Sequence, residues 1–226
     1  MASFGMRSLL ACILLIALAA ASEAAIVEGT ARVIDGDTLE IQDEIIRLHG
    51  IDAPENAQTC RKPNGKEWQC GQEAATALSE LVGRRPVTCE GRERDAYGRT
   101  IAVCRIDDTE INRWLVAQGW AVAFRRYSTD YVDAETEARA QGAGIWASTF
   151  DMPWEYRNRI WAAAANQAPD PNCPIKGNIN SKGERIYHTP WGSHSYSKTK
   201  INTANGERWF CDEAEAVAAG WRAPFN

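Results

Sequence analysis

Several residue types and patterns that mark particular classes of protein are scarce or missing in this chain. Its 226 residues include only three histidines, and no C-x-x-C pair occurs among seven cysteines, which disfavours a structural zinc site. The net charge of −5 gives no general attraction for a polyanion, so any nucleic-acid contact would need locally clustered positive charge. No internal repeat or low-complexity tract is present. The length leaves room for one domain and a smaller second one.

No apolar run at the N-terminus is long enough to cross a bilayer, which takes about 20 residues. Arg7 precedes an uncharged stretch over 9–21, and small residues follow up to Ala24. A basic start, a short apolar core and small residues predict a secretory signal over 1–24, cleaved near Ala24. We therefore expect a secreted or periplasmic protein with no stable membrane insertion after cleavage.

Cleavage there would remove Cys12 and leave an even number of cysteines in an exported chain, which predicts three disulfides. Sequence alone does not fix how they connect. Their order along the chain suggests the pairs Cys60–Cys70, Cys89–Cys104 and Cys173–Cys211.

Residues 26–149 alternate between strand-like and helix-like patterns. Strand patterns over 26–42 and 45–48 are broken at 35–37 and 43–44, and a hairpin is expected from 87–89 and 101–104. Helical patterns occupy 72–82, about 109–118 and 130–140. This order predicts an α+β, mainly β fold: a five-stranded OB-fold barrel with three packed helices.

The remaining residues differ in composition. Residues 150–170 read as a helical spacer, and 171–226 as a small module with short strands at 175–179 and 186–188. A capping box opening at Asp212 and a stop at Gly220 predict one helix there. A disulfide within the module is favoured, and zinc bound by Cys173, His188, His194 and Cys211 is the alternative. The sequence does not indicate what the module binds.

Charged residues interrupt the barrel pattern at neighbouring places. A strand meander would bring Asp37 beside Asp52, and two like charges this close are costly unless a cation lies between them. Carboxylate oxygens, with a backbone carbonyl near Ala53, suit Ca²⁺ or Mg²⁺ and not zinc. Each charged stretch taken alone also fits an ordinary turn or a solvated loop. Their combination favours a metal site.

Two arginines and one further carboxylate complete a catalytic set. The planar guanidinium groups of Arg47 and Arg99 suit phosphate oxygens, and fixed cations lower the barrier for attack on a phosphodiester. Glu55 is not needed as a metal ligand and could hold the attacking water. The residues therefore predict phosphodiester hydrolysis.

Three stretches make a resemblance specific: DGDT at 35–38, RLHGIDAPE at 47–55 and DAYGR at 95–99. In order and spacing, residues 26–146 resemble the thermonuclease (staphylococcal nuclease-like) family. The resemblance implies hydrolysis of DNA and RNA with 3′-phosphate products. It implies Arg47, Glu55 and Arg99 as catalytic residues, and Tyr97 beside the terminal phosphate. It also implies Asp37, Asp52 and the carbonyl of Ala53 as Ca²⁺ ligands.

The chain departs from the family pattern at a few positions. Ala53 replaces a threonine, which is harmless if only the carbonyl binds, and Ala96 replaces a lysine that could contact phosphate. A tyrosine pair expected near 123–127 is absent in that form; instead Phe124 and Tyr127 are candidate base-stacking platforms, and Arg126 adds attraction for phosphate. These changes bear on substrate preference. His49 lies among strand residues, and we expect a structural role for it.

The main alternative is a non-catalytic nucleic-acid-binding barrel of the cell envelope, since OB-folds often bind without cutting. A binder would not need Asp37, Asp52 and Glu55, because carboxylates repel phosphate. An envelope adhesion protein that uses the C-terminal module is a third possibility. We expect a monomer.

Overall fold

One bent segment at the N-terminal end closes the main sheet. The computed structural model describes residues 25–192 and 195–224. In it, β1 (Ala25–Thr30) and β2 (Arg32–Asp35) are separated only by Ala31. β1 pairs with β8 (Pro86–Arg94), while β2 pairs with β3 (Thr38–Ile41), both antiparallel. The strand order is β1-β8-β9-β4-β3-β2, so the path begins and ends in the two halves of this segment.

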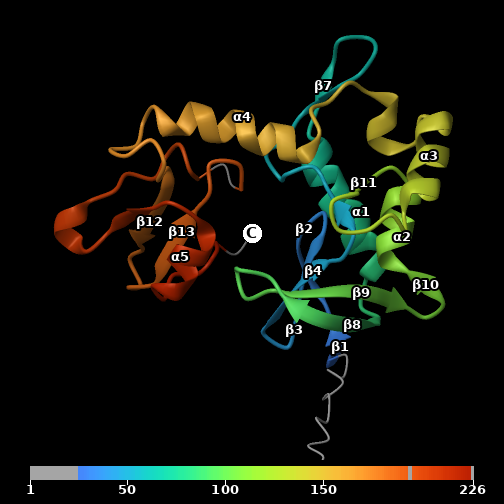
Figure 1. The fold of residues 1–226 in the computed structure, drawn as a ribbon, viewed down its shortest axis with the longest axis horizontal. Helices are drawn as coiled ribbons and strands as arrows, with labels where there is room; N and C mark the ends of the chain where they lie inside the picture. The colour runs from blue at the N-terminus through green and yellow to red at the C-terminus, as the bar shows by residue number, and fades with distance from the viewer. Residues whose placement is uncertain (1–24, 193–194, 225–226) are drawn as a thin grey trace, which may run out of the picture.

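The two central strands, β4 (Glu44–Leu48) and β9 (Thr100–Ile106), are parallel, and β8 and β9 form the predicted hairpin. Along β9 every second residue is buried, as expected for a strand with one face on a core. Three helices pack with this sheet, as predicted: α1 (Cys70–Val82), α2 (Ile111–Ala117) and α3 (Val132–Gln141). The fold of this part is therefore mixed α+β (Figure 1). The short elements here are β5 (Ile51–Asp52), β6 (Cys60–Arg61), β7 (Glu67–Trp68), β10 (Thr109–Glu110), β11 (Val122–Ala123) and η1 (Gly144–Ala147).

Several predicted boundaries were wrong: β8 extends beyond Cys89 to Arg94, and the helix expected from about 109 begins at Ile111, after the short strand β10. The turn between β3 and β4 consists of Gln42 and Asp43, both with positive φ, so Glu44 already belongs to the strand. A two-residue turn of this kind matches the twist of the paired strands. Helix α1 begins at Cys70 and not at Gln72.

A second, smaller core lies in the C-terminal part, which we call the C-terminal lobe (173–192 and 195–224). Its sheet has the order β13-β12-β14, from β12 (Ile175–Ile179), β13 (Arg185–His188) and β14 (Arg208–Phe210). The lobe also contains η2 (Thr203–Asn205) and α5 (Glu213–Ala218). Asp212 caps α5 as predicted, because its carboxylate accepts a hydrogen bond from the Glu215 amide at 2.7 Å.

Helix α4 (Pro153–Ala165) spans the distance between the two parts (Figure 1). The core of the C-terminal lobe comprises Ile175, Tyr187, Phe210, Ala216 and Trp221. It shares no buried residue with the core of the barrel. The division into domains at 149 and 171 stays a prediction. The predicted signal over 1–24 lies outside the described residues, and none of the described helices is long and apolar enough to span a bilayer.

All three expected disulfides are present: Cys60–Cys70, Cys89–Cys104 and Cys173–Cys211. Because Cys173 and Cys211 are bonded to each other, their sulfurs are not free thiolate ligands for zinc. Among the described residues, no three or more His, Cys, Asp or Glu side chains are grouped as a metal site. His194, the fourth residue of the zinc alternative, lies outside the described residues.

The disulfide of the C-terminal lobe should contribute most of its stability, because the core around it is small. It closes a separation of 38 residues. Replacing both Cys173 and Cys211 by Ala should lower the free energy of unfolding of this lobe by about 3 kcal/mol. Urea titration followed by tryptophan fluorescence measures this. The control is a Cys89→Ala/Cys104→Ala variant, which lacks the disulfide of the barrel. The prediction would be contradicted if the C-terminal lobe unfolded at the same urea concentration with and without its own disulfide.

Candidate active site

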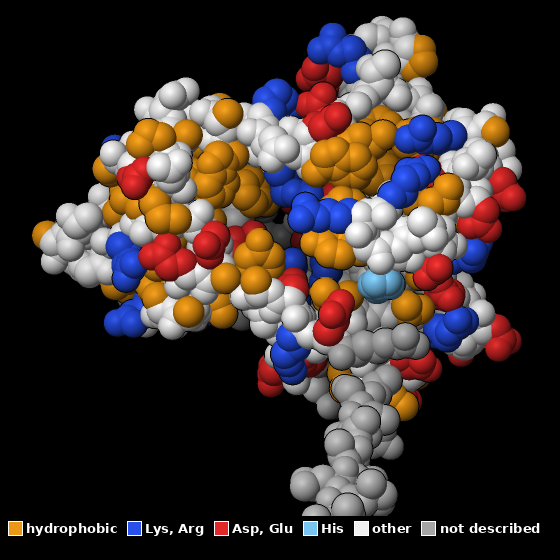
Figure 2. Space-filling view, viewed as in Figure 1, with side chains coloured by type: hydrophobic (Ala, Val, Ile, Leu, Met, Phe, Trp, Pro, Cys, Tyr) orange, Lys and Arg blue, Asp and Glu red, His pale blue; other side chains and the backbone are white. Residues whose placement is uncertain are grey.

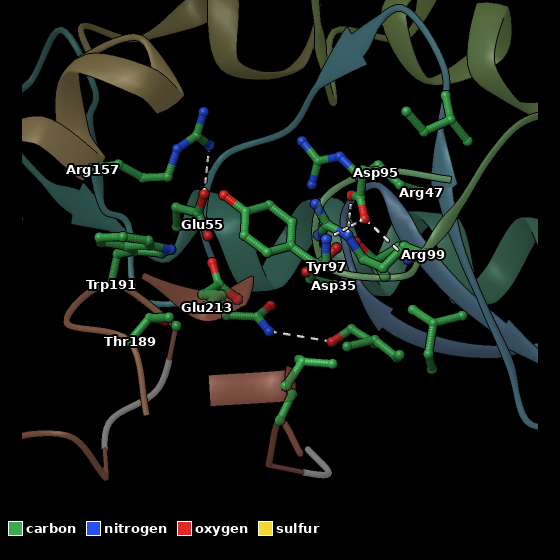
Figure 3. A pocket seen from close by; sticks show the side chains of 18 of the residues that line it. Asp35, Arg47, Glu55, Asp95, Tyr97, Arg99, Arg157, Thr189, Trp191 and Glu213 are labelled. Carbon is green, nitrogen blue, oxygen red and sulfur yellow. Dashed lines mark hydrogen bonds and ion pairs between the residues drawn. The ribbon is translucent and has the colours of Figure 1, made fainter. Parts of the chain in front are cut away.

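A cavity of about 680 Å³ lies between the barrel, α4 and the C-terminal lobe. Figure 2 shows the hollow between the two lobes, with basic side chains beside it. The predicted catalytic residues line it from several strands and loops, and Figure 3 shows them from close by, whereas the predicted metal ligands Asp37, Asp52 and Ala53 do not line the cavity. The residues lining it from the barrel side include Asp35, Arg47, Glu55, Tyr97 and Arg99.

Arg47 joins the two buried aspartates. Its Nη1 donates to Asp37, and its Nη2 donates to Oδ1 of Asp52 at 2.9 Å. The pairing of β3 with β4 places Thr38 opposite Arg47, which brings Asp37 within reach of the guanidinium. The carboxylate of Asp37 also accepts the amide hydrogen of Ala53 at 2.7 Å. The two aspartates therefore lie on either side of the Arg47 guanidinium, at the place where the sequence predicted a divalent metal ion.

Burial sets the protonation of this group. Burial raises the pKa of Asp37 to about 6, with a further increase from the nearby Asp35, although Arg47 and the Ala53 amide act in the opposite direction. Burial alone would lower the pKa of Arg47, but the surrounding carboxylates outweigh it and the pKa is raised. Arg47 therefore stays charged, because the carboxylates around it favour a positive charge between the two aspartates.

Glu55 lies at the rim of the same group, with 15% of its side chain exposed. Its Oε1 accepts a hydrogen bond from Nη1 of Arg157 at 2.6 Å. Burial raises the pKa of Glu55 to about 8, while Arg157 opposes this increase. Once ionised, a carboxylate with a raised pKa is a stronger proton acceptor than an ordinary, fully solvated glutamate.

Arg157 was not predicted from the sequence. It projects from α4 and binds Asp52 through both Nη atoms, at 3.0 and 2.8 Å, in addition to Glu55. Burial alone would lower its pKa, but these carboxylates outweigh that effect and raise it. Asp52 is fully buried and forms ion pairs with both Arg47 and Arg157, which are far apart from each other in the sequence.

Arg99 and Tyr97 lie on the β8–β9 turn. Nε of Arg99 donates to Asp95 at 2.7 Å, and its guanidinium lies 4.9 Å from the centre of the Tyr97 ring. Asp95 also accepts the amide hydrogens of Tyr97 and Arg99, both at 2.9 Å. The aspartate therefore fixes the whole turn, and both side chains line the cavity (Figure 3).

Of the three residues predicted to bind substrate near 123–127, two lie at the cavity and one does not. Phe124 and Tyr127 line the cavity, with ring centres 5.1 Å apart, and Phe124 stacks on Trp154 of α4 at 5.6 Å. Tyr127 is 61% exposed. Arg126 does not line the cavity; its guanidinium lies 5.9 Å from the Tyr127 ring. The structure therefore brings Phe124 and Tyr127 to the site and leaves Arg126 outside it.

The loop that carries Glu55 is fixed by the side chain of Gln58 and packs against Gly71 of α1. Gln58 is buried and accepts the Glu55 amide hydrogen at 3.2 Å, while its own amide donates to the carbonyl of Asp151 at 2.7 Å. Gly71 lies under the same loop, and a Cβ there would come within 1.8 Å of the Glu55 carbonyl oxygen. Only glycine permits this close approach.

His49 contributes mainly through its backbone. Its carbonyl accepts a hydrogen bond from the buried Asn112 at 2.9 Å, and its amide donates to Ala102 at 2.8 Å. Its side chain lines the cavity. The structural role expected for it stays a prediction.

Two further groups at the cavity were missed. The C-terminal lobe contributes Glu213, whose carboxylate accepts the Tyr187 hydroxyl hydrogen at 3.0 Å and faces Arg99 and Arg47. Helix α4 contributes a face with residues at i, i+3, i+4 and i+7: Trp154, Arg157, Asn158 and Trp161, of which the last three line the cavity and Trp154 stacks on Phe124. This spacing is a helical-face signal in the sequence. Glu213 had no such signal.

Comparison with known proteins identifies the barrel. The family described as Staphylococcal nuclease homologue matches residues 45–148. An uncharacterized endonuclease from Escherichia coli O157:H7 is 35% identical over 136 residues, which cover 57% of this chain and 82% of the relative. The chain therefore belongs to the staphylococcal nuclease family, whose barrel is an OB-fold.

Two more relatives show how far the similarity extends. A micrococcal nuclease from Shigella flexneri is 33% identical, over 56% of this chain and 77% of its own length. Succinoglycan biosynthesis protein ExoI from Rhizobium meliloti (strain 1021) is 44% identical over 52% of this chain, which spans 63% of that relative. The family match ends at residue 148, so α4 and the C-terminal lobe lie beyond it.

Removing Arg157 should destabilise the protein, because Asp52 and Glu55 would lose their shared partner. In the absence of divalent cations, Arg157→Gln should lower the free energy of unfolding by about 3 kcal/mol, the cost of breaking a buried ion pair. Arg159→Gln, on the same helix, is the control, since the ion pair of Arg159 with Asp151 is exposed and should contribute less than about 1 kcal/mol. Equal losses in the two variants, measured by urea titration, would contradict this role.

Proposed function

We propose that the protein is a calcium-dependent phosphodiesterase that hydrolyses DNA and RNA on a five-stranded OB barrel, leaving 3′-phosphates. The observation that carries the proposal is the convergence of Arg47, Glu55 and Arg99 on one cavity above the paired aspartates. Membership of the staphylococcal nuclease family and the relatives named as nucleases support it.

The two arginines stabilise charge on the reacting phosphate. Attack by water places extra negative charge on the phosphoryl oxygens, and guanidinium groups already fixed at the cavity stabilise it without reorganising. Arg47 is held by two aspartates and Arg99 by Asp95, so both approach the phosphate with their orientation set. To contact it, each must exchange part of this pairing for phosphate oxygens.

Glu55 accepts the proton of the attacking water. The water oxygen forms a bond to phosphorus as the bond from phosphorus to the 5′-oxygen breaks, which leaves the phosphate on the 3′ side. The raised pKa of Glu55 strengthens it as a base. Its neighbour Arg157 holds the carboxylate in the cavity through Oε1.

The donor set beneath the cavity fits a hard divalent cation. Asp37 and Asp52 present carboxylate oxygens on either side of one guanidinium, and the carbonyl of Ala53 follows directly. Buried carboxylates this close require positive charge, which Arg47 and Arg157 provide here. Calcium held by these three residues would polarise the phosphate and assist ionisation of the water.

Export and a monomeric state complete the proposal. Three disulfides are typical of proteins in oxidising compartments outside the cytoplasm. We infer that the protein acts in the periplasm or outside the cell. Binding of nucleic acid without cleavage remains the alternative that the next experiment tests.

Replacing Glu55 by Gln should lower the rate of cleavage of plasmid DNA and of RNA by about 100- to 10,000-fold, because the proton acceptor is lost. Substrate binding should persist. A chelator should abolish cleavage by the unaltered protein. Glu67→Gln, which alters an exposed ion pair with Arg61, is the matched control and should leave the rate unchanged. Binding of both substrates with no cleavage in calcium would favour the non-catalytic alternative, and full activity in chelator would exclude the metal.

Arg157 and calcium should compete for Asp52, because the guanidinium occupies both carboxylate oxygens. Arg157→Gln should therefore bind calcium about tenfold more tightly than the unaltered protein, a difference of about 1.4 kcal/mol. Isothermal titration calorimetry measures the dissociation constants without reference to activity. Arg159→Gln should bind calcium as the unaltered protein does. Unchanged or weaker calcium binding by Arg157→Gln would contradict the competition.

A further inference from the structure

The cavity has a second wall that does not come from the barrel. Helix α4 supplies Arg157, Asn158 and Trp161, and the C-terminal lobe supplies Trp191 and Glu213. All five lie beyond residue 148, where the family match ends. A bare barrel of the family length would leave this side of the catalytic residues open to solvent. Here a substrate must fit between two walls.

The second wall presents a pair of tryptophans. The ring centres of Trp161 and Trp191 are 5.7 Å apart, with an interplanar angle of 32°. Trp161 also packs against the core of the C-terminal lobe, which holds its position. Both rings are only partly buried, and both line the cavity. A pair of indoles fixed by packing, with surface left in a cavity, can stack on a planar ligand at little entropic cost.

The charges of the two walls differ. Arg47 and Arg99 reach the cavity from the barrel, and Arg157 reaches it beside Glu55. The wall of the C-terminal lobe contributes the carboxylate of Glu213, and its one arginine, Arg222, is paired with Glu184 at 3.0 Å. The barrel wall also carries the carboxylates of Asp35, Glu55, Glu93 and Asp95, so the positions of the guanidinium groups, and not the net charge of either wall, define where a phosphate binds. A nucleotide whose phosphate contacts the arginines has its base directed toward the tryptophans.

We propose that Trp161 and Trp191 form a base-binding subsite, on which an unpaired base stacks while its phosphodiester lies against Arg47 and Arg99. The inference rests on the proposed nuclease function and adds to it the part of the substrate that the lobe recognises. In Figure 3, Trp191 and Arg157 lie on one side of Glu55 and Tyr97, and Arg47 and Arg99 lie on the other. Phe124 and Tyr127 offer a separate aromatic surface on the barrel.

The size of the cavity supports recognition of an unpaired base. Its volume of about 680 Å³ is within the range of pockets that enclose a small molecule. In a duplex the bases are stacked and paired inside the helix, whereas bases of a single strand can be splayed out onto aromatic side chains. The subsite therefore selects single-stranded DNA or RNA, or a frayed end.

Binding of an oligothymidylate should be compared with that of an oligonucleotide of the same length whose sugars carry no bases. Fluorescence anisotropy gives both dissociation constants for the full chain. The unaltered protein should bind the base-containing strand about tenfold or more tightly than the abasic one. Trp191→Leu and Trp161→Leu should each remove most of this preference and leave affinity for the abasic strand unchanged. Trp191→Phe, which keeps an aromatic face, should retain part of it.

The control is Trp209→Leu, because Trp209 lies in the same lobe and does not line the cavity. It should keep the full preference for bases. If Trp191→Leu lost the same affinity for the base-containing and the abasic oligonucleotide, the tryptophans would only hold the C-terminal lobe against the barrel. That result would overturn the subsite. So would an unaltered protein with no preference for the base-containing strand, whether or not the variants fold. Cleavage of the abasic strand in calcium tests the proposed nuclease function independently, since that reaction needs the arginines, Glu55 and calcium but no nucleobase.

Discussion

The guanidinium of Arg47 between two buried aspartates is the interaction on which the site depends. Asp37 and Asp52 come from separate segments, and neither carboxylate could remain buried and ionised beside the other without a cation between them. The antiparallel pairing of β3 with β4 fixes where that cation lies. The barrel thus has several charged side chains close together at one end. One of them, Asp37, accepts the amide hydrogen of Ala53 and so positions the loop that carries Glu55. The geometry of the candidate site and the stability of the fold therefore depend on the same contacts.

Much of the barrel could be predicted because its signals are local. The Asp35-Gly36-Asp37 break and the strand alternation act over a few positions, and the structure has strands where they indicate them. The pairing of cysteines followed their order along the chain. Boundaries were less certain, because Gln42 and Asp43 adopt positive φ without glycine. The proximity of Asp37 and Asp52 could be inferred because a meander allows few arrangements.

The contribution of the C-terminal half could not be predicted in the same way. Arg157 reaches Asp52 across 105 positions of sequence, and no local pattern encodes that contact. Glu213 enters the cavity only because the C-terminal lobe packs there. The helical spacing of Trp154, Arg157 and Trp161 marked a face without revealing its partner. Interactions between lobes depend on packing of surfaces, and sequence periodicity describes each surface separately. The helix interpreted as a spacer is thus a component of the site.

The bent segment formed by β1 and β2 has a consequence for the order of folding. It pairs with β3 nearby in sequence and with β8, where Ala25 lies opposite Gly91. While a growing chain ends before residue 86, β1 lacks its strand partner β8 and the path of strands stays open. Closure is then a late event that joins distant parts of the chain, and such contacts form slowly because a long loop must be ordered first. The topology therefore keeps the part of the chain that carries the candidate site incompletely folded until β8 and β9 have been synthesised.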